Sequence, residues 1–217
     1  MQLDILDRMK LTKFDHSCML VEDGDTRILI DPGSFTPGFE TLTGVRAVLV
    51  THQHPDHVDL ERLPQLIERN PGVSVYTDPG TAGLLGDAGV EASIVRSGDK
   101  LDLGLSVHVY GEQHAIIHPD IPVVANVGYL IGGRFFHPGD SFHPPDADIE
   151  VLGLPTAAPW QKLSEAVDFL REVNPSIAIP IHQAILAKPE LYYGHFERLG
   201  PKHTELRILS PGETLTL

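Results

Sequence analysis

Short apolar runs separated by turn residues dominate the first half of the chain. Residues 18–22 and 27–31 flank Asp23-Gly24-Asp25, and a glycine-containing turn between two apolar runs predicts a β-hairpin. Residues 45–51 form another apolar run, which predicts a buried strand that leads into His52. The other elements expected here are a helix with apolar positions from Val58 to Ile67, a strand over 73–77, a short helix over 81–88, and β-structure over 92–110 that turns near Gly98-Asp99.

The second half of the chain repeats the hairpin pattern. Residues 126–131 and 134–137 flank Gly132-Gly133, and Asp140 follows this hairpin as Asp31 ends the earlier one. This order indicates a weak internal duplication, with two β-rich halves that each carry a carboxylate after a hairpin. The other elements expected here are strands over 149–154 and 176–181, helices over 160–173 and 191–199, and a final hairpin over 206–217 around Pro211-Gly212.

Alternating strands and helices with additional hairpins predict an α/β sandwich. The chain has 217 residues, of which 41% are hydrophobic, and no low-complexity linker, so we expect one globular domain over residues 1–217. Residues 1–10 include charged side chains and no long apolar run. We therefore expect no signal peptide, no membrane-spanning helix and, by default, a cytoplasmic location.

Charge and cysteine content argue against several classes of function. Acidic residues outnumber basic ones 30 to 16, and the resulting formal net charge of −14 disfavours binding to a nucleic-acid backbone. Cys18 is the only cysteine, so an intrachain disulfide and a thiolate zinc site are both excluded. The chain has 12 histidines, and histidine is the commonest metal ligand. Any metal site would therefore use imidazole and carboxylate groups.

The densest group of potential metal ligands comes directly after a predicted strand. His52, His54, Asp56 and His57 fall within six residues. In extended backbone, residues two apart point the same way, so His52 and His54 can bind one ion together. Pro55 suits the first turn of a helix, and such a turn would direct Asp56 and His57 toward a second ion. The alternative interpretation is a solvated, histidine-rich loop.

This His-x-His-x-Asp-His cluster resembles the metallo-β-lactamase superfamily, whose five motifs occur in a fixed order. The corresponding residues here are Asp31, the cluster from His52 to His57, His114 in Gly111-Glu112-Gln113-His114, Asp140 in Gly139-Asp140-Ser141, and His182 in Ile179-Pro180-Ile181-His182. The resemblance implies a four-layer αββα sandwich. Within the superfamily, the short length and Asp15-His16-Ser17 are similar to the small metal-dependent hydrolases related to ascorbate-phosphate lactonase.

The resemblance also implies roles for the matched residues. The first of two metal ions would be held by His52, His54 and His114, the second by Asp56, His57 and His182, and both by a bridging Asp140. Imidazole and carboxylate ligands suit Zn²⁺, with Mn²⁺ or Fe as alternatives. Two ions roughly 3.5–4 Å apart can share a water, convert it to hydroxide near neutral pH and stabilise the oxyanion that forms on attack.

Two further residues near the motifs have alternative interpretations. Asp31 either braces the histidine loop through hydrogen bonds or is a turn residue in Asp31-Pro32-Gly33. Trp160, which comes just before a predicted helix, is either a core residue or the wall of a pocket.

Five histidines outside the implied ligand set also lie close to the motifs or in predicted loops: His16, His118, His137, His143 and His195. His118 follows His114 by four residues, and His143 follows Asp140 by three. Either could protonate a leaving group, and either could instead be exposed or support a ligand.

The complete motif set predicts a metal-dependent hydrolase that cleaves a small-molecule ester, lactone or phosphoester, with candidate catalytic residues Asp56, Asp140, His118 and His143. The alternatives are a non-catalytic metal-binding or regulatory homologue, and a phosphodiesterase or nuclease of the same superfamily, which the net charge disfavours. We expect a small-molecule substrate, no membrane partner and no nucleic acid. Association with further copies of the chain as a homo-oligomer stays open. Specificity is expected to lie in the loops 33–44, 115–125, 141–148 and 183–195.

Overall fold

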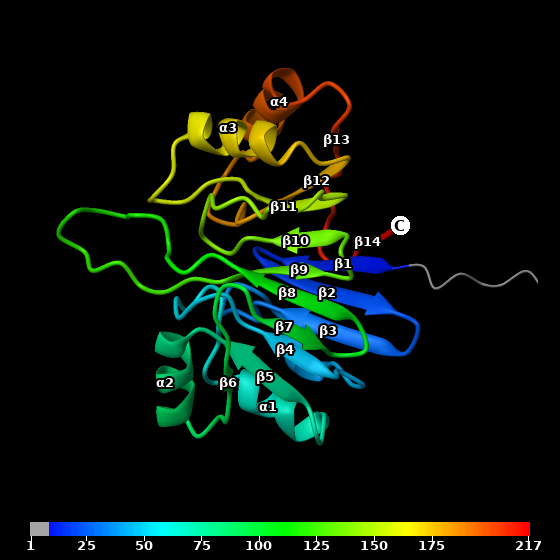
Figure 1. Cartoon of the computed structure of the whole chain (residues 1–217), viewed down its shortest axis with the longest axis vertical. Coiled ribbons are helices and arrows are strands. Elements are labelled where there is room, and N and C mark those ends of the chain that lie inside the picture. Colours follow the sequence, from blue (N-terminus) through cyan, green and yellow to red (C-terminus); the bar gives the residue numbers. More distant parts are fainter. Residues whose placement is uncertain (1–8) are drawn as a thin grey trace, which may run out of the picture.

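Two β-sheets pack face to face in the computed structural model, which describes residues 9–217, and helices cover both outer faces (Figure 1). Helices α1 (Leu63–Arg69) and α2 (Pro79–Asp87) lie outside one sheet, and α3 (Leu163–Val173) and α4 (Glu190–Leu199) lie outside the other. The layers therefore run helix, sheet, sheet, helix, and the predicted αββα sandwich is confirmed.

Each sheet has seven strands. The first sheet has the order β14-β1-β2-β3-β4-β5-β6, and the second has the order β13-β12-β11-β10-β9-β8-β7. The strands of the first sheet are β1 (Lys10–Asp15), β2 (Cys18–Asp23), β3 (Thr26–Ile30), β4 (Ala47–Leu49), β5 (Ser74–Thr77), β6 (Ser93–Ile94) and β14 (Thr214–Thr216). Those of the second are β7 (Lys100–Asp102), β8 (Ser106–Tyr110), β9 (Gly128–Ile131), β10 (Phe135–His137), β11 (Val151–Pro155), β12 (Ile177–Ile181) and β13 (Glu205–Leu206).

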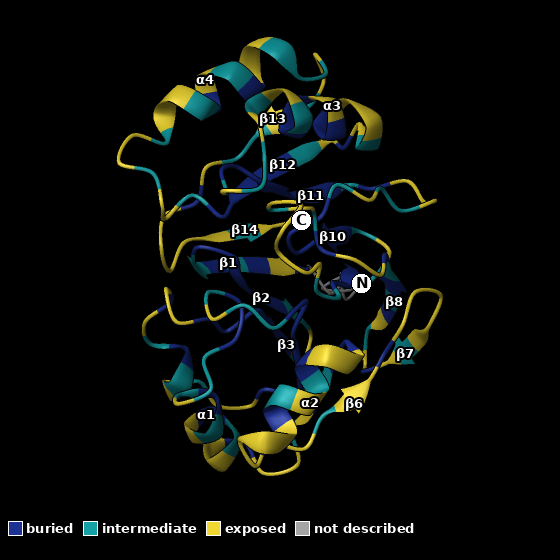
Figure 2. Cartoon of the chain, turned by 90° about the vertical axis from the view of Figure 1, so that its left-hand side faces the viewer, coloured by how far each residue is buried: buried dark blue, intermediate teal, exposed yellow. Residues whose placement is uncertain are grey.

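The central strands are apolar on both faces because each sheet lies between two layers. In β2, Met19 and Val21 pack into the core between the sheets, and Leu20 packs toward α1 and α2. In β9, Tyr129 packs between the sheets and Leu130 packs toward α3 and α4. Burial of one such side chain stabilises the fold by about 1.5–3 kcal/mol. Figure 2 shows this division, with buried residues in the sheets and exposed residues on the outer sides of the helices.

The two halves share a strand order, in agreement with the predicted duplication. β2 and β3 pair antiparallel, and β4 and β5 then add in parallel. In the second sheet β9 and β10 pair antiparallel, and β11 and β12 then add in parallel. The carboxyl ends of neighbouring parallel strands lie at the same sheet edge, so the residues that follow β3 and β4, and those that follow β10 and β12, are neighbours in space.

Three predicted elements differ from the structure. Residues 206–217 form no hairpin: β13 extends the second sheet beside β12, and β14 extends the first beside β1, because each short strand pairs with an open sheet edge. At Gly98-Asp99 the chain does not turn within one sheet but passes from β6 in the first sheet to β7 in the second. The helix expected from Val58 begins at Leu63. Among residues 9–217, no helix combines the length and the apolar character that crossing a bilayer requires.

Candidate metal centre

Two groups of histidine and aspartate side chains form the candidate site. In each group, one ligand atom from every member lies within 4.8 Å of the others. The first group contains His52, His54, His114 and Asp140, and the second contains His16, Asp56, His57 and His182. The fold thus brings together all the residues that the sequence implied as metal ligands, and it adds His16.

The carboxylate of Asp140 lies between the two groups. Its Oδ2 is 3.3 Å from Nε2 of His114 in the first group and 3.3 Å from Nε2 of His182 in the second. Its Oδ1 is 3.2 Å from Nε2 of His57. One buried carboxylate therefore faces both groups at the same time.

Left-handed backbone places several residues of the site. His16, in the turn between β1 and β2, has φ 44°, Asp31 after β3 has φ 48°, and His182 after β12 has φ 60°. Asn174 is the only other non-glycine residue with positive φ in the described part of the chain. Each such conformation costs about 1–3 kcal/mol and is typical of functional sites, where the surroundings hold the strained backbone.

Asp31 braces the histidine loop through hydrogen bonds, which is the first of the two roles considered for it from the sequence. Its carboxylate is fully buried and accepts hydrogen bonds from the backbone N–H and the hydroxyl of Thr51, both over 2.8 Å. It also accepts from Nδ1 of His57 over 2.7 Å. Asp31 therefore ties the strand end after β3 to the histidine loop after β4.

His16 is the group member that the sequence interpretation left outside the ligand set. Its Nε2 lies 3.1 Å from Oδ2 of Asp56, and its ring centroid is 4.1 Å from that of His182. Its backbone carbonyl accepts from the N–H of His182 over 3.2 Å. The side chain is fully buried. The five ordered motifs leave His16 out, because it reaches the site from a separate hairpin turn. The sequence marked it only within Asp15-His16-Ser17 and as a histidine outside the ligand set.

A buried lysine holds the His16 turn against the end of β12. Nζ of Lys13 donates to the carbonyls of His16 over 3.0 Å and Pro180 over 2.6 Å, and to Oε1 of Gln183 over 2.8 Å. The side chain is 1% exposed. Burial lowers the pKa of Lys13 to about 7.

Hydrogen bonds at Nδ1 orient three of the imidazoles. Nδ1 of His114 donates to the carbonyl of Ala115 over 2.5 Å, Nδ1 of His182 to that of Ala157 over 2.7 Å, and Nδ1 of His57 to the carboxylate of Asp31. A proton held on Nδ1 leaves the Nε2 lone pair of a neutral imidazole free to bind a metal. Two backbone carbonyls and the Asp31 carboxylate thus prepare Nε2 of these histidines to act as ligands.

The carboxylates of the site are ionised. Burial alone would raise the pKa of Asp140, but His57 and His182 outweigh it and hold that pKa well below its usual value. For Asp56, the neighbouring imidazoles of His16 and His182, at 3.1 Å and 3.2 Å from its Oδ2, likewise overcome burial and lower the pKa. Burial would also lower the pKa of His182, but the Asp140 carboxylate raises it to about 9.

The donor atoms fit a divalent cation. Within residues 9–217, Nε2 of His57, His114 and His182 and Oδ1 of Asp140 are buried and have no aligned hydrogen-bond partner. Nε2 of His57 lies 3.2 Å from Oδ1 of Asp140, and Nε2 of His114 and of His182 each lie 3.3 Å from its Oδ2. Unpaired buried polar atoms are costly, and convergent nitrogen and oxygen lone pairs are the ligands that Zn²⁺ and similar ions take.

Comparison with known proteins identifies the family. Residues 10–182 match the model of the beta-lactamase superfamily domain. The chain belongs to the beta-lactamase superfamily. The resemblance found in the motifs is therefore confirmed.

Several relatives of this chain align with it over nearly its whole length. Protein Rv0786c of Mycobacterium tuberculosis is 48% identical over 216 residues, which cover 96% of this chain and 100% of the relative. A protein of Aeropyrum pernix called a UPF0173 metal-dependent hydrolase is 28% identical, with 94% and 96% covered. Igni18, described as a metallo hydrolase from Ignicoccus hospitalis, has 21% identity, a TM-score of 0.76, and 97% and 98% coverage. The last comparison shows the shared fold.

The two histidines predicted as proton donors occupy different places on this superfamily domain. His143 is exposed and lines a hollow of about 640 Å³ whose wall includes His114, Glu112 and Phe142. The side chain of His118 is 60% exposed, and its Nδ1 accepts from the N–H of Asp120. The fold therefore brings His143 beside the candidate metal centre and leaves His118 on an exposed loop.

The remaining singled-out residues have structural roles or lie elsewhere. His137 is buried and its Nε2 donates to the carbonyl of Ser17 over 2.8 Å. His195, on α4, contacts Arg198 at the protein surface. Trp160 is half-buried, and its indole Nε1 donates to Oδ2 of Asp140 over 2.8 Å. A contact with the central carboxylate is neither of the two roles that the sequence suggested for this tryptophan.

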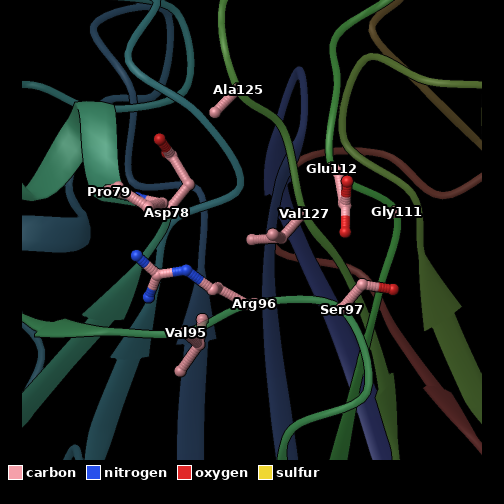
Figure 3. Close-up of a pocket in the computed structure, with 9 residues that line it drawn as sticks. All are labelled: Asp78, Pro79, Val95, Arg96, Ser97, Gly111, Glu112, Ala125 and Val127. Atoms are coloured by element: carbon pink, nitrogen blue, oxygen red, sulfur yellow. The ribbon is translucent and has the colours of Figure 1, made fainter.

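A smaller cavity of about 240 Å³ adjoins the hollow beside His114, since Ser97, Gly111 and Glu112 line both. Figure 3 shows Arg96 and Glu112 on opposite sides of this cavity, with Val127 between them. A further hollow of about 570 Å³ is lined by His54 of the first group. The candidate metal centre is thus flanked by spaces large enough for a small molecule.

Proposed function

We propose that this chain cleaves its substrate with a dinuclear metal centre. His52, His54 and His114 hold one ion, Asp56, His57 and His182 hold the other, and Asp140 bridges both. The position of the Asp140 carboxylate, within 3.3 Å of histidines from both groups, is the observation that carries this proposal. Zn²⁺ is the preferred ion for these ligands, with Mn²⁺ or Fe as alternatives.

The enzyme is a metal-dependent hydrolase, in keeping with the names of its relatives. When bound, two divalent ions supply Lewis acidity toward the reacting carbonyl or phosphoryl oxygen and lower the pKa of water. The residues of the chain orient this chemistry. Asp31 holds His57 in one tautomer, and the carbonyls of Ala115 and Ala157 do the same for His114 and His182.

The positions of the two candidate proton donors relative to the metal centre favour His143 over His118. It lines the hollow that includes His114, whereas His118 contacts Asp120 on an exposed loop. A positioned general acid contributes about 10²- to 10⁴-fold to a hydrolysis rate. In this proposal, His143 donates a proton to the leaving-group oxygen from the side of the hollow.

The substrate is a small ester, lactone or phosphoester. The hollows at His114 and His54 are large enough for small molecules, and no lysine or arginine appears among their described lining residues. Basic side chains are what proteins use to bind nucleic-acid backbones, so this lining and the net charge of −14 support a small substrate over a nuclease substrate. The cytoplasmic location and a homo-oligomer are predictions from the sequence, which fractionation and light scattering would test.

Metal content and turnover test the proposal together. The purified full chain, loaded with Zn²⁺ or Mn²⁺ and then desalted, should contain two ions and hydrolyse at least one member of a panel of chromogenic esters, lactones and phosphodiesters. Asp140→Asn should abolish turnover and leave the circular dichroism spectrum unchanged. Less than one ion per chain would contradict the metal centre. Two ions with no turnover on any substrate would favour the non-catalytic homologue.

A further inference from the structure

The indole of Trp160 contacts the one carboxylate that joins the two ligand groups. Its Nε1–H donates to Oδ2 of Asp140 over 2.8 Å. Trp160 lies in the loop between β11 and α3, and Asp140 lies in the loop after β10. The backbone N–H of Asp140 is anchored separately, on Oδ1 of Asn126 over 3.0 Å. The Trp160 bond therefore acts on the carboxylate itself rather than on the turn that carries it.

Packing fixes the direction from which this N–H approaches. The Trp160 ring meets Phe142 edge-on with centroids 5.0 Å apart, and Phe142 packs on Phe169 of α3 with centroids 5.2 Å apart. The indole also meets the ring of His114 edge-on, with centroids 5.8 Å apart. Aromatic contacts of this kind hold a ring in one orientation. A chain of rings thus runs from the buried face of α3 to a candidate metal ligand.

An indole N–H has the chemistry needed to orient this carboxylate without competing for metal. It only donates, carries no charge and has no lone pair for an ion. Oδ2 of Asp140 is also 3.3 Å from both His114 and His182, so a rotation of the carboxylate would move it away from one group. A hydrogen bond to an ionised acceptor is about twice as strong as a neutral one.

We propose that Trp160 is a positioning residue that holds Asp140 in the orientation that spans both metal positions. This inference rests on the proposed dinuclear centre and adds to it a contact that the ligand motifs do not include. Partners that orient metal ligands in this way typically change metal affinity or activity by about 10- to 100-fold when removed. Trp160 should therefore act on metal affinity and turnover number rather than on substrate binding.

The chain contains a single tryptophan, which makes a one-atom test practicable. Expression in a tryptophan auxotroph supplied with β-(3-benzothienyl)alanine replaces the indole N–H by sulfur at position 160 alone and keeps the ring shape. Titration of the metal-free full chain with Zn²⁺ in a calorimeter should then show affinity at least about 10-fold weaker than for the normal protein. The turnover number should fall by a similar factor, with KM unchanged.

A second measurement uses the normal protein. Co²⁺, a paramagnetic ion, should quench the Trp160 fluorescence in step with its occupancy of the site. Phe142→Leu loosens the ring packing that aims the N–H but keeps the N–H itself, so it should weaken Zn²⁺ binding less than loss of the N–H does. Zn²⁺ affinity and turnover that are equal with and without the N–H would overturn the role of Trp160 alone. A normal protein that binds no Zn²⁺ would overturn the dinuclear centre as well.

Discussion

Asp31 and His57 form a fully buried pair, in which Nδ1 of the imidazole donates to the carboxylate over 2.7 Å. The two residues come from different strand ends, since Asp31 follows β3 and His57 lies in the loop after β4. The carboxylate fixes the proton on Nδ1 and turns Nε2 of His57 toward Asp140, at 3.2 Å from Oδ1. A residue outside the two candidate ligand groups thus controls the direction of an imidazole within one of them.

Asp31→Asn should weaken the binding of the second ion by about 10- to 100-fold, because an amide supports His57 less well than a carboxylate does. The substitution suits the backbone, since Asn is among the residues that tolerate the φ of 48° at this position. Calorimetric Zn²⁺ titration measures the effect, and circular dichroism checks the fold. Wild-type affinity in a folded Asp31→Asn variant would show that the brace is dispensable.

His16→Asn should lower the affinity of the second ligand group while the first ion still binds. His16 contacts Asp56 at 3.1 Å and packs on His182, and Asn tolerates the left-handed backbone of this turn. The matched control is His118→Asn, on an exposed loop, which should retain two ions. Metal analysis after desalting distinguishes these outcomes. Two tightly bound ions in the His16→Asn variant would rule out a role for His16 in metal binding.

Gly33→Ala should displace the histidine loop. A Cβ at this position would lie 1.8 Å from the backbone oxygen of Asp56, which cannot move without the loop. Overpacking of this kind typically costs about 1–3 kcal/mol, and the shift of Asp56 should also reduce metal content. The control is Gly83→Ala in α2, where the added methyl meets open space and a helix gains from alanine. Equal thermal unfolding and metal content in both variants would contradict the predicted clash.

The free energy of unfolding of the metal-free protein should rise with pH above about 7 through Lys13. Burial lowers the pKa of Lys13 from 10.5 to about 7, so between these values the unfolded chain binds a proton that the folded chain lacks. The free energy of unfolding therefore increases with pH in this range, with a slope of up to about 1.4 kcal/mol per pH unit.

Urea unfolding in chelator at several pH values tests this effect by comparison with Lys13→Met. That variant loses three hydrogen bonds and is less stable overall, but it lacks the titrating amine. The wild-type curve should rise relative to the variant between pH 7 and pH 10. Parallel curves would mean that Lys13 stays charged in the folded protein.

Removal of metal should destabilise the fold. An ion that binds only the folded state, at a free concentration 1,000 times its Kd, stabilises by about 4 kcal/mol. For a chain of this size this corresponds to a fall in Tm on the order of 10 °C on addition of chelator. Differential scanning calorimetry measures the fall, and Asp140→Asn should show much less of it. A Tm that chelator leaves unchanged would contradict tight binding by the folded chain.

The sequence alone determined the superfamily, the αββα layers and the residues that converge at the site. Metal-ligand motifs are local in sequence, and the resemblance that they carry implied the four layers, whereas the apolar runs by themselves predicted only an α/β sandwich. The same local signals misplaced the elements at the sheet edges. Residues 206–217 look like a hairpin, but β13 and β14 do not pair with each other. β13 pairs with β12 in the second sheet, and β14 pairs with β1 in the first. Local pattern does not specify which open edge a short strand will join.

Only the tertiary structure decided how the ligands are supported. His16 contacts Asp56, which is 40 positions away in sequence, and Lys13 contacts Pro180, which is 167 positions away. Trp160, in the loop after β11, contacts Asp140, in the loop after β10. These contacts depend on the order of strands in two sheets and on three left-handed residues at the site, none of which a one-dimensional pattern encodes. The physical reason is that a ligand is chosen by its chemistry, whereas its orientation is set by whatever the fold packs beside it.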